Sequence, residues 1–466
     1  MIDTTEKLQS WIDEFERSRD PQQPEWLHRL REEAFARFLD RGFPTLKNED
    51  WRFTSVQPIA NTAFQLAQRA GQSSLVPDAQ IPAGISVSLV FVNGCFAPQL
   101  SQLDGLPAGV VVTSLKAALN RGDSWVEQHL ARYADFDDDA FAALNTAFLE
   151  EGVCVRIPRG MVLEQPIYAL YVSAAGVAPE MVHPRNLIVC EEDSQATVVE
   201  DYVSTGSGAF FSNVVTELVA GDNSVVSHYL IEREDRHALN VSTLRIQQGR
   251  NANVTSHSIL LGGGLVRNNV HPVLTGEGGE CLINGLFVGT GRQHLDNYMK
   301  VEHRAPYCGS RQFYNGILDQ HARGVFHGRI IVHQDAQKTD AKQTNRNLLL
   351  SDDAQIDTKP QLEIYADDVK CTHGATIGQI DETALFYLRS RGLPEAQARA
   401  LLLYAFAHEN LDRMKPGPVR TWLEGLVTEW LPQSQGAPPS NGAQDVPALL
   451  GDPRNQGHGR NWQEVG

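Results

Sequence analysis

The sequence predicts a mainly β protein in which a long β-solenoid lies between an N-terminal mixed α/β domain and a C-terminal helical domain. Apolar residues recur at helical spacing near both ends of the chain. Between about residues 152 and 377 this spacing is replaced by short alternating runs rich in Val, Ile, Thr and Tyr. Turn-forming sequences recur through that segment at roughly coil-length intervals. The predicted parts are residues 1–150, 151–380, 381–431 and 432–466.

The first forty residues predict two helices. Asp3 and Glu6 have the spacing of a capping box, and Gly42 and Pro44 stop the second helix. A short strand around 87–91 and a helical stretch near 124–149 follow, so this part is expected to be mixed α/β. The two apolar stripes consist of Leu8, Trp11, Ile12 and Phe15, and of Trp26, Leu27, Leu30, Ala34 and Phe38.

The central segment is punctuated by EEDSQ at 191, AGDNS at 220, GRNAN at 249 and GEGGE at 276. Ser227-His228 and Ser256-His257 lie 29 residues apart, each two residues after a valine. A coil of this length suits a β-solenoid, in which each coil stacks its strands on those of its neighbours. A β-sandwich with regular turns has similar spacing, so the repeats alone leave that fold open.

Residues 381–431 return to helical periodicity, and each expected helix has one apolar face to bury. Trp422, Leu426 and Trp430 share a stripe that is predicted either to pack on the solenoid or to bind a partner protein. Residues 432–466 contain five prolines and six glycines without periodicity, which predicts a disordered tail.

Composition and missing motifs exclude several functions. The net charge of −17 leaves no basic excess for nucleic acid. No export-signal core and no run of eighteen apolar residues occurs, so we expect a cytoplasmic protein that does not bind membranes. The six cysteines form no C-x-x-C pair, which indicates reduced thiols. No G-x-x-x-x-G-K-[ST] loop is present, so no nucleotide site is expected.

One short stretch combines two metal-binding side chains. In ADDVKCTHGATIGQID, strand alternation places Cys371 and His373 on the same face, together with Val369, Ala375 and Ile377. A thiolate beside an imidazole is a partial site for iron or another borderline metal, but tetrahedral iron needs four donors. Either a partner chain supplies the rest, or these are a packed cysteine and a hydrogen-bonded histidine. The residues alone favour the packing interpretation.

The block from Ala341 to Leu393 is the most distinctive part of the chain: AKQTNRNLLLSDDAQIDTKPQLEIYADDVKCTHGATIGQIDETALFYLRSRGL. AQARALLLYAFAHE follows it, and EDWRFT lies upstream at Glu49–Thr54. These segments closely resemble the SufB/SufD family of iron–sulfur cluster assembly proteins. The form K-C-T-H-G-A-T-I-G is similar to the SufD branch of that family.

The resemblance implies a right-handed parallel β-helix and a non-catalytic scaffold in the ATP-driven SufBCD complex. It implies a heterodimer with a SufB subunit through the β-helix and a SufC ATPase docked on the C-terminal helices, or a homodimer in isolation. A transient iron–sulfur cluster would form at the interface with SufB, with His373 as the preferred ligand and Cys371 as a second candidate. A reduced flavin is associated with such complexes, and the resemblance gives it no site here.

Two other functions are compatible with parts of the sequence. A β-helix carbohydrate-active enzyme needs paired carboxylates in a groove, for which Asp352, Asp353 and Asp357 are candidates. Such enzymes are usually exported, and SDD before a strand is more simply a turn. The other alternative is a β-solenoid interaction module without metal chemistry.

Overall fold

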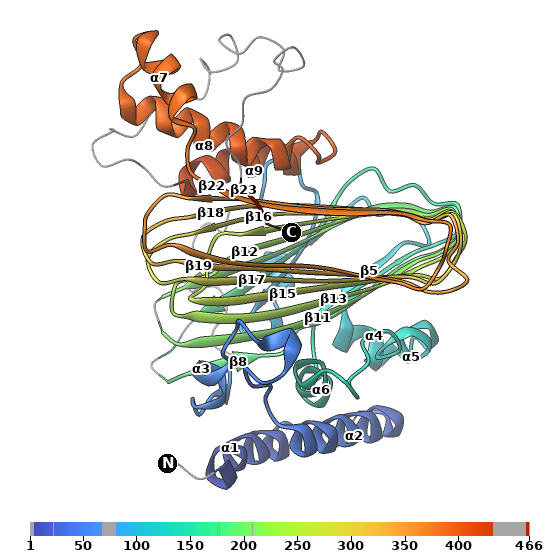
Figure 1. Ribbon diagram of the computed structural model, residues 1–466. Helices are drawn as coiled ribbons and strands as arrows, with labels where there is room; N and C mark the ends of the chain where they lie inside the picture. Colours follow the sequence, from blue (N-terminus) through green and yellow to red (C-terminus); the bar gives the residue numbers. More distant parts are fainter. Residues whose placement is uncertain are drawn as a thin grey trace.

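The computed structural model describes residues 4–21, 23–67, 81–174, 176, 178–206, 208–431 and 463–465. Its centre is a solenoid built from two parallel sheets, which we call sheet A and sheet B (Figure 1). The N-terminal helices lie against one side of the solenoid and the C-terminal helices against the opposite side. The predicted mainly β chain with a parallel β-helix core is therefore confirmed.

Sheet A is parallel apart from one antiparallel pair at its start, β5 with β6. In spatial order it contains β5 (Val111–Ser114), β6 (Val153–Ile157), β9 (Arg185–Cys190), β11 (Phe210–Ala220), β13 (Ala238–Gln248), β15 (Leu265–Leu274), β17 (His294–His303), β19 (Arg323–Val332) and β21 (Gln355–Ile364). β8 (Glu180–Val182) also pairs with β11, and β1 (Gln65–Leu66) pairs with β8.

Sheet B faces sheet A across the solenoid and is parallel from β2 to β22, with an antiparallel pair at each end. In spatial order it contains β3 (Cys95–Phe96), β2 (Val87–Val92), β7 (Ile167–Ala174), β10 (Gln195–Thr205), β12 (Val225–Arg233), β14 (Asn253–Leu260), β16 (Glu280–Gly289), β18 (Gly309–Leu318), β20 (Asp340–Leu349), β22 (Lys370–Gly378) and β23 (Gln463–Val465), with β4 (Gln102–Leu103) beside β2.

The punctuating turns of the sequence mark one corner of successive coils. Asp193, Asn223, Asn251 and Gly278 lie at these four corners with φ of 59°, 58°, 52° and 72°. Asp, Asn and Gly tolerate this left-handed conformation better than other residues, which explains their recurrence. Each corner N–H donates to a carbonyl of the next coil, as from Asn223 to Arg250 at 2.8 Å. The turn spacing therefore predicted the coil length correctly.

The Ser-His repeat, in contrast, does not superpose in the structure. The offset between β12 and β14 is 28 residues, because Val225 pairs with Asn253, so His228 lies beside Ser256 and not beside His257. His228 points into the solenoid and contacts Glu200 at 3.0 Å, whereas His257 lies outside and stacks on a tyrosine. The two histidines are 29 residues apart in the sequence, whereas the coil between β12 and β14 is 28 residues long. This difference of one residue places them on opposite faces of sheet B.

The interior of the solenoid, which we call the lumen, is filled by the alternate side chains of both sheets. Most are aliphatic or aromatic, but polar side chains are fully buried among them. Glu200, for example, contacts His228 and accepts hydrogen bonds from Tyr202 at 2.6 Å and Thr216 at 2.8 Å. Glu200 and these three partners satisfy one another's hydrogen bonds, as is usual for polar groups in a low-dielectric interior.

The N-terminal helices cover the outer face of sheet A. Phe15 and Phe35 stack at 4.0 Å, and Trp11 contacts Phe211 of β11 edge-on at 6.5 Å. The predicted capping box includes Asp3, which lies outside the described residues. The elements of this part are α1 (Thr4–Arg17), α2 (Glu25–Arg41), η1 (Glu49–Trp51), α3 (Gln57–Ala60), η2 (Pro98–Leu100), α4 (Leu115–Arg121), α5 (Ser124–His129) and α6 (Ala140–Ala147).

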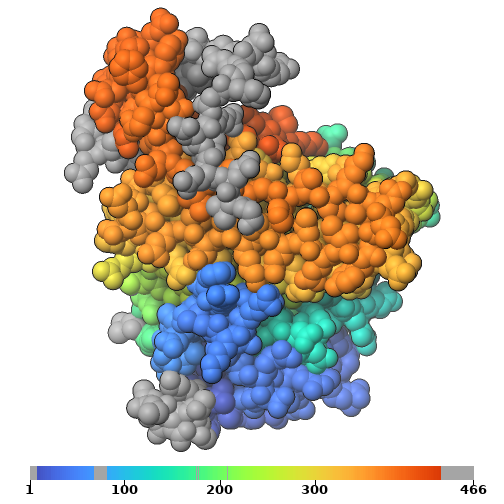
Figure 2. Space-filling model, viewed as in Figure 1, coloured from blue at the N-terminus to red at the C-terminus, as the bar shows by residue number. Residues whose placement is uncertain are grey.

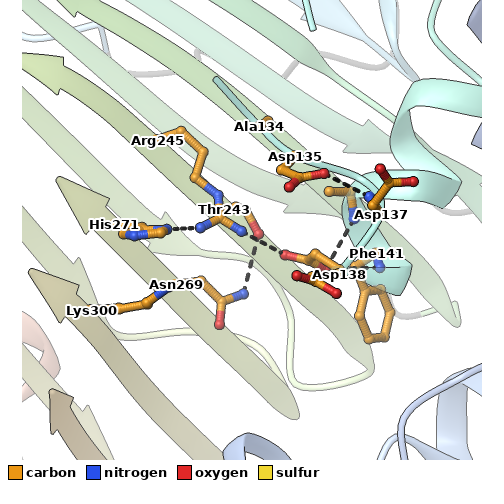
Figure 3. A network of polar contacts seen from close by, with 12 residues as sticks. Ala134, Asp135, Asp137, Asp138, Phe141, Thr243, Arg245, Asn269, His271 and Lys300 are labelled. Carbon is orange, nitrogen blue, oxygen red and sulfur yellow. Dashed lines mark hydrogen bonds and ion pairs between the residues drawn. The ribbon is translucent and has the colours of Figure 1, made fainter. Parts of the chain in front are cut away.

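Polar contacts also attach this domain to sheet A. Arg245 extends from β13 between His271 of β15 and the loop before α6, where its guanidinium lies 3.1 Å from Asp139 (Figure 3). His271 in turn contacts Glu302 of β17 at 2.9 Å. A short ladder of polar and charged groups therefore connects three neighbouring strands to the start of α6.

The C-terminal helices α7 (Glu382–Ser390), α8 (Glu395–Leu411) and α9 (Pro418–Trp430) lie on the side of sheet B. Leu403, Leu423 and Val427 are buried in a cluster with outward-facing residues of sheet B. Asn410 of α8 donates to the backbone carbonyl of Gly285 at 2.7 Å. None of the helices in the described part of the chain is long and apolar enough to span a bilayer.

Residues 432–466 were predicted to be a disordered tail, and all but 463–465 of them lie outside the described residues. Those three residues form β23, which pairs antiparallel with β22 from Ala375 to Ile377.

Candidate functional site

The strand that carries Cys371 and His373 is β22, the last strand of the solenoid in sheet B. It runs parallel to β20, with Cys371 opposite Ala341 and His373 opposite Gln343. Ala341 and Gln343 are both buried on the lumen side of β20. The two candidate ligands therefore share the lumen-facing side of β22, as the strand alternation predicted.

The two side chains differ in accessibility. Cys371 is half-buried and packs against the lumen core, and this burial raises the pKa of its thiol. His373 is exposed even though it faces the lumen side. The imidazole is thus available to a partner, whereas the thiol must lose its proton and some of its packing to bind a metal.

His373 is exposed because the solenoid ends there. In the described part of the chain, β21 and β22 are the last solenoid strands of sheets A and B. Among the same residues, β23 pairs with the edge of β22 from Ala375 to Ile377. Ile364, the last residue of β21, is 41% exposed, and Tyr365, which follows it, is 64% exposed. We call this surface the open end of the solenoid, and its strands form the band across the middle of the view in Figure 2.

Behind His373, two lumen amides continue the polar interior to the open end. Gln343 donates from Nε2 to Oε1 of Gln312 at 2.9 Å, and both side chains are about fully buried. Within the described residues, Gln343 Oε1 and Gln312 Nε2 have no hydrogen-bond partner. The sequence alone does not reveal this pair. Gln343 precedes His373 by one coil, but this relation becomes apparent only once the register of β20 and β22 is known.

The two candidate ligands at the open end would supply at most half of the donors that a tetrahedral metal site needs. Cys371 and His373 are two residues apart on one strand, so their Cα atoms lie about 7 Å from each other. Among the described residues, no group of three or more His, Cys, Asp and Glu side chains is arranged to hold a metal ion. This arrangement can donate one imidazole, and at most one thiolate, to a metal held jointly with another molecule.

The three carboxylates weighed for a glycosidase do not form a catalytic pair. Asp357 is occupied by an ion pair with Arg323, at 2.6 Å. Asp352 and Asp353 lie in the exposed turn before β21, where Asp353 is 3.5 Å from His321. Two carboxylates facing each other across a groove are required for glycoside hydrolysis, and these three side chains do not provide them.

The apolar stripe of α9 lies partly against the solenoid. Trp422, Leu426 and Trp430 are half-buried beside the cluster on sheet B. The Trp422 ring meets Tyr168 edge-on at 6.2 Å, and the Arg233 guanidinium lies over it at 5.4 Å. A partner-binding role for this stripe stays a prediction.

More exposed aromatic side chains lie on α7. Phe386 and Tyr387 are 72% and 56% exposed, which is unusual for large apolar groups at neighbouring positions. The helical pattern of the sequence does not by itself distinguish these two side chains from the buried ones. Their exposure makes α7 a second candidate surface for a protein partner.

Comparisons with known proteins agree with this architecture. Residues 171–406 match the family model described as "SUF system FeS cluster assembly, SufBD core domain", and residues 3–169 match the SufBD protein N-terminal region. An iron–sulfur cluster assembly SufBD family protein of Synechocystis is 33% identical over 80% of this chain and 84% of its own length.

Two relatives carry the name iron–sulfur cluster assembly protein SufD. The Escherichia coli protein is 32% identical over 91% of this chain and 97% of its own length. The Bacillus subtilis protein is 26% identical over 87% of this chain and 94% of its own length. With a core model that matches residues 171–406 and relatives that match 80% to 91% of the chain, the chain belongs to the SufBD family of iron–sulfur cluster assembly proteins.

Proposed function

We propose that this chain is a non-catalytic scaffold subunit that supports iron–sulfur cluster assembly at an interface with a SufB-type partner. The observation that carries the proposal is the open end of the solenoid, where an exposed histidine sits on an edge strand. Edge strands present unpaired N–H and C=O groups that another chain can continue. A partner that adds its own strands there would complete the coordination of a metal at His373.

In this proposal the cluster is cargo, and the chain supplies a ligand for it. His373 donates an imidazole nitrogen from its exposed position, and the partner contributes the remaining donors. Cys371 is the weaker candidate, because burial raises the pKa of its thiol and its side chain already packs on the lumen core. In isolation, the same open end would pair with a second copy of this chain.

ATP hydrolysis belongs to a separate SufC-type subunit, since the sequence has no phosphate-binding loop. We propose that this ATPase docks on the C-terminal helices, with Phe386 and Tyr387 of α7 as its principal contacts. Trp422, Leu426 and Trp430 then hold α9 on sheet B and present their remaining exposed area to the partner. The assembly would work in the cytoplasm, and the reduced flavin of such complexes is given no site on this chain.

One co-purification experiment tests both interfaces. Ile364→Asp with Tyr365→Asp places charge on the open end, so it is expected to lose the SufB-type partner and keep the ATPase. Phe386→Ala with Tyr387→Ala is expected to show the reverse, because the two surfaces belong to different elements. Each variant serves as the control for the other, and thermal unfolding checks that both are folded.

Retention of the SufB-type partner by the Ile364/Tyr365 variant would show that the open end is not that interface. Normal ATPase capture by the Phe386/Tyr387 variant would move the dock away from α7.

A further inference from the structure

A basic pocket of about 450 Å³ lies on the outer face of sheet B, beside the end of α8. It is separate from the metal-binding candidates, which face the lumen. Arg311 of β18 and Lys342 of β20 line one side of it, and Arg346 and Arg413 line the other. Four cations around one concavity are unexpected in a chain whose net charge is −17.

The strand register brings two of these cations together. Arg311 is directly opposite Lys342 on the neighbouring parallel strand, and both project outward. Neighbouring strands are about 4.8 Å apart, and like charges directly opposite each other destabilise a sheet. An unfavourable pair of like charges of this kind is expected where the residues bind a ligand, because function can outweigh the local loss of stability.

The second pair of cations surrounds an aromatic ring. The Arg413 guanidinium lies 3.7 Å from the centre of the Phe313 ring, and that of Arg346 lies 5.7 Å from it. Glu409 binds the Arg346 guanidinium at 2.8 Å. Burial lowers the pKa of Arg413, and the charge of Arg346 acts in the same direction. The ring thus has two guanidinium groups beside it at the rim of the pocket, where cation–π attraction helps to hold them.

Several donors in the pocket are unused. Arg311 is paired with Asp340 at 2.8 Å and Arg346 with Glu409, but Lys342 and Arg413 form no ion pair with any described residue. Asn284 lines the pocket from the outward side of β16 and is 4% exposed. Its side-chain amide makes no hydrogen bond within the part of the chain that the structure describes. The Lys342 ammonium, the Arg413 guanidinium and the buried Asn284 amide therefore line one pocket, and none of the three forms a hydrogen bond or ion pair with another side chain among the described residues.

We propose that this pocket binds a small phosphate-bearing metabolite with two anionic groups. Its volume is that of a small-molecule site. Lys342 and Arg346 are four residues apart on one strand, so the two cationic sides are about 13 Å apart at Cα, room enough for two charged groups. Guanidinium groups bind phosphate oxygens through paired N–H donors. The proposal is independent of the metal site at the open end.

Isothermal titration of the full-length chain with pyrophosphate tests the proposal. We expect saturable binding that weakens with added salt, because the contacts are between charges. Lys342→Ala and Arg413→Ala are each expected to weaken it about tenfold, since each removes a charge-assisted hydrogen bond. Arg292→Ala, which removes an exposed cation on the turn after β16, is the matched control and should bind as the wild type does.

Asn284→Asp provides a second variant, because it adds a carboxylate to the pocket and should also weaken binding. Circular dichroism and thermal unfolding establish that each variant is folded. The proposal is overturned if pyrophosphate does not bind, or if the pocket variants bind it as well as Arg292→Ala does. It is equally overturned if a polyglutamate peptide binds through Lys342 and Arg413 while pyrophosphate does not, since the pocket would then be a docking surface for an acidic protein segment.

Discussion

The histidines of this chain divide into buried and exposed groups, and the two groups have different consequences. His183 and His257 are buried on the outer faces of the sheets, and burial lowers the pKa of each to about 3. His303 is buried as well, and its pKa falls to about 4. His373, in contrast, is exposed on the last strand. The buried histidines therefore bear on stability, and the exposed one is available for ligand binding.

The buried histidines predict a loss of stability in mild acid. The unfolded chain binds a proton at His257 below about pH 6.5, whereas the folded chain binds it only near pH 3, so stability falls as the pH drops through this window. One such histidine costs about 2–3 kcal/mol at pH 4.5 relative to pH 7. Urea unfolding of the wild type and of the His257→Phe variant at both pH values measures this loss in the free energy of unfolding.

His257 stacks on Tyr229, and within the described residues neither of its ring nitrogens has a hydrogen-bond partner, so phenylalanine can replace it without breaking a bond. We expect the His257→Phe variant to lose less stability between pH 7 and pH 4.5 than the wild type. An identical loss in both proteins would show that His257 is not a source of the acid sensitivity.

At the same scale, the sequence identified the two candidate ligands but not their difference. Strand alternation placed Cys371 and His373 on one face, which the register of β22 against β20 agrees with. It could not show that Cys371 contacts the lumen core while His373 is exposed. That difference depends on where the solenoid ends, which is a property of the coil stack and not of the local pattern.

At the scale of elements, one buried ion pair joins the N-terminal domain to the first coils. Arg185 of β9 and Glu217 of β11 are fully buried and 2.7 Å apart. Glu217 also accepts hydrogen bonds from the backbone N–H groups of Ala131, Tyr133 and Ala134, between 2.7 and 3.0 Å. One carboxylate thus fixes a loop of the N-terminal domain on sheet A.

Removing this carboxylate is expected to be costly. Glu217→Ala leaves the Arg185 guanidinium charged and buried and frees three backbone donors, so we expect a loss of about 3–5 kcal/mol in the free energy of unfolding. Glu25→Ala breaks an exposed pair with Arg29 on α2 and should cost less than about 1 kcal/mol. Chemical denaturation compares the two. Equal effects would mean that the buried pair does not hold this junction.

The coil length was predictable from sequence because corner residues need a left-handed backbone, which favours Asn, Asp and Gly, and these residues occupy four successive corners. Strand register was not predictable in the same way. The Ser-His repeat suggests a register that is wrong by one residue, because the coils differ in length. A register shift of one residue moves every side chain of a strand to the opposite face. Buried partners such as Glu200 and His228, 28 residues apart, follow only from the register.

At the scale of the whole molecule, the chain presents three distinct surfaces around one solenoid. The N-terminal helices pack on sheet A, the C-terminal helices cover part of sheet B, and the open end presents the last strands of the solenoid, β21 and β22. A solenoid that ends without a full cap exposes strand edges, which other proteins avoid unless a partner covers them. The open end is therefore the feature that most directly connects the fold with the proposed assembly at a SufB-type partner.

The most direct test is the iron content and visible cluster absorbance of the complex purified with SufB- and SufC-type partners from cells that express each variant. For His373→Ala we expect an assembled complex with a steep loss of iron and cluster absorbance, because an exposed ligand is removed without opening a cavity. Cys371→Ser should have a weaker effect, and His321→Ala, an exposed histidine on a turn, should have none. Normal iron and cluster content in the His373→Ala complex would contradict the proposal that this subunit supplies a cluster ligand.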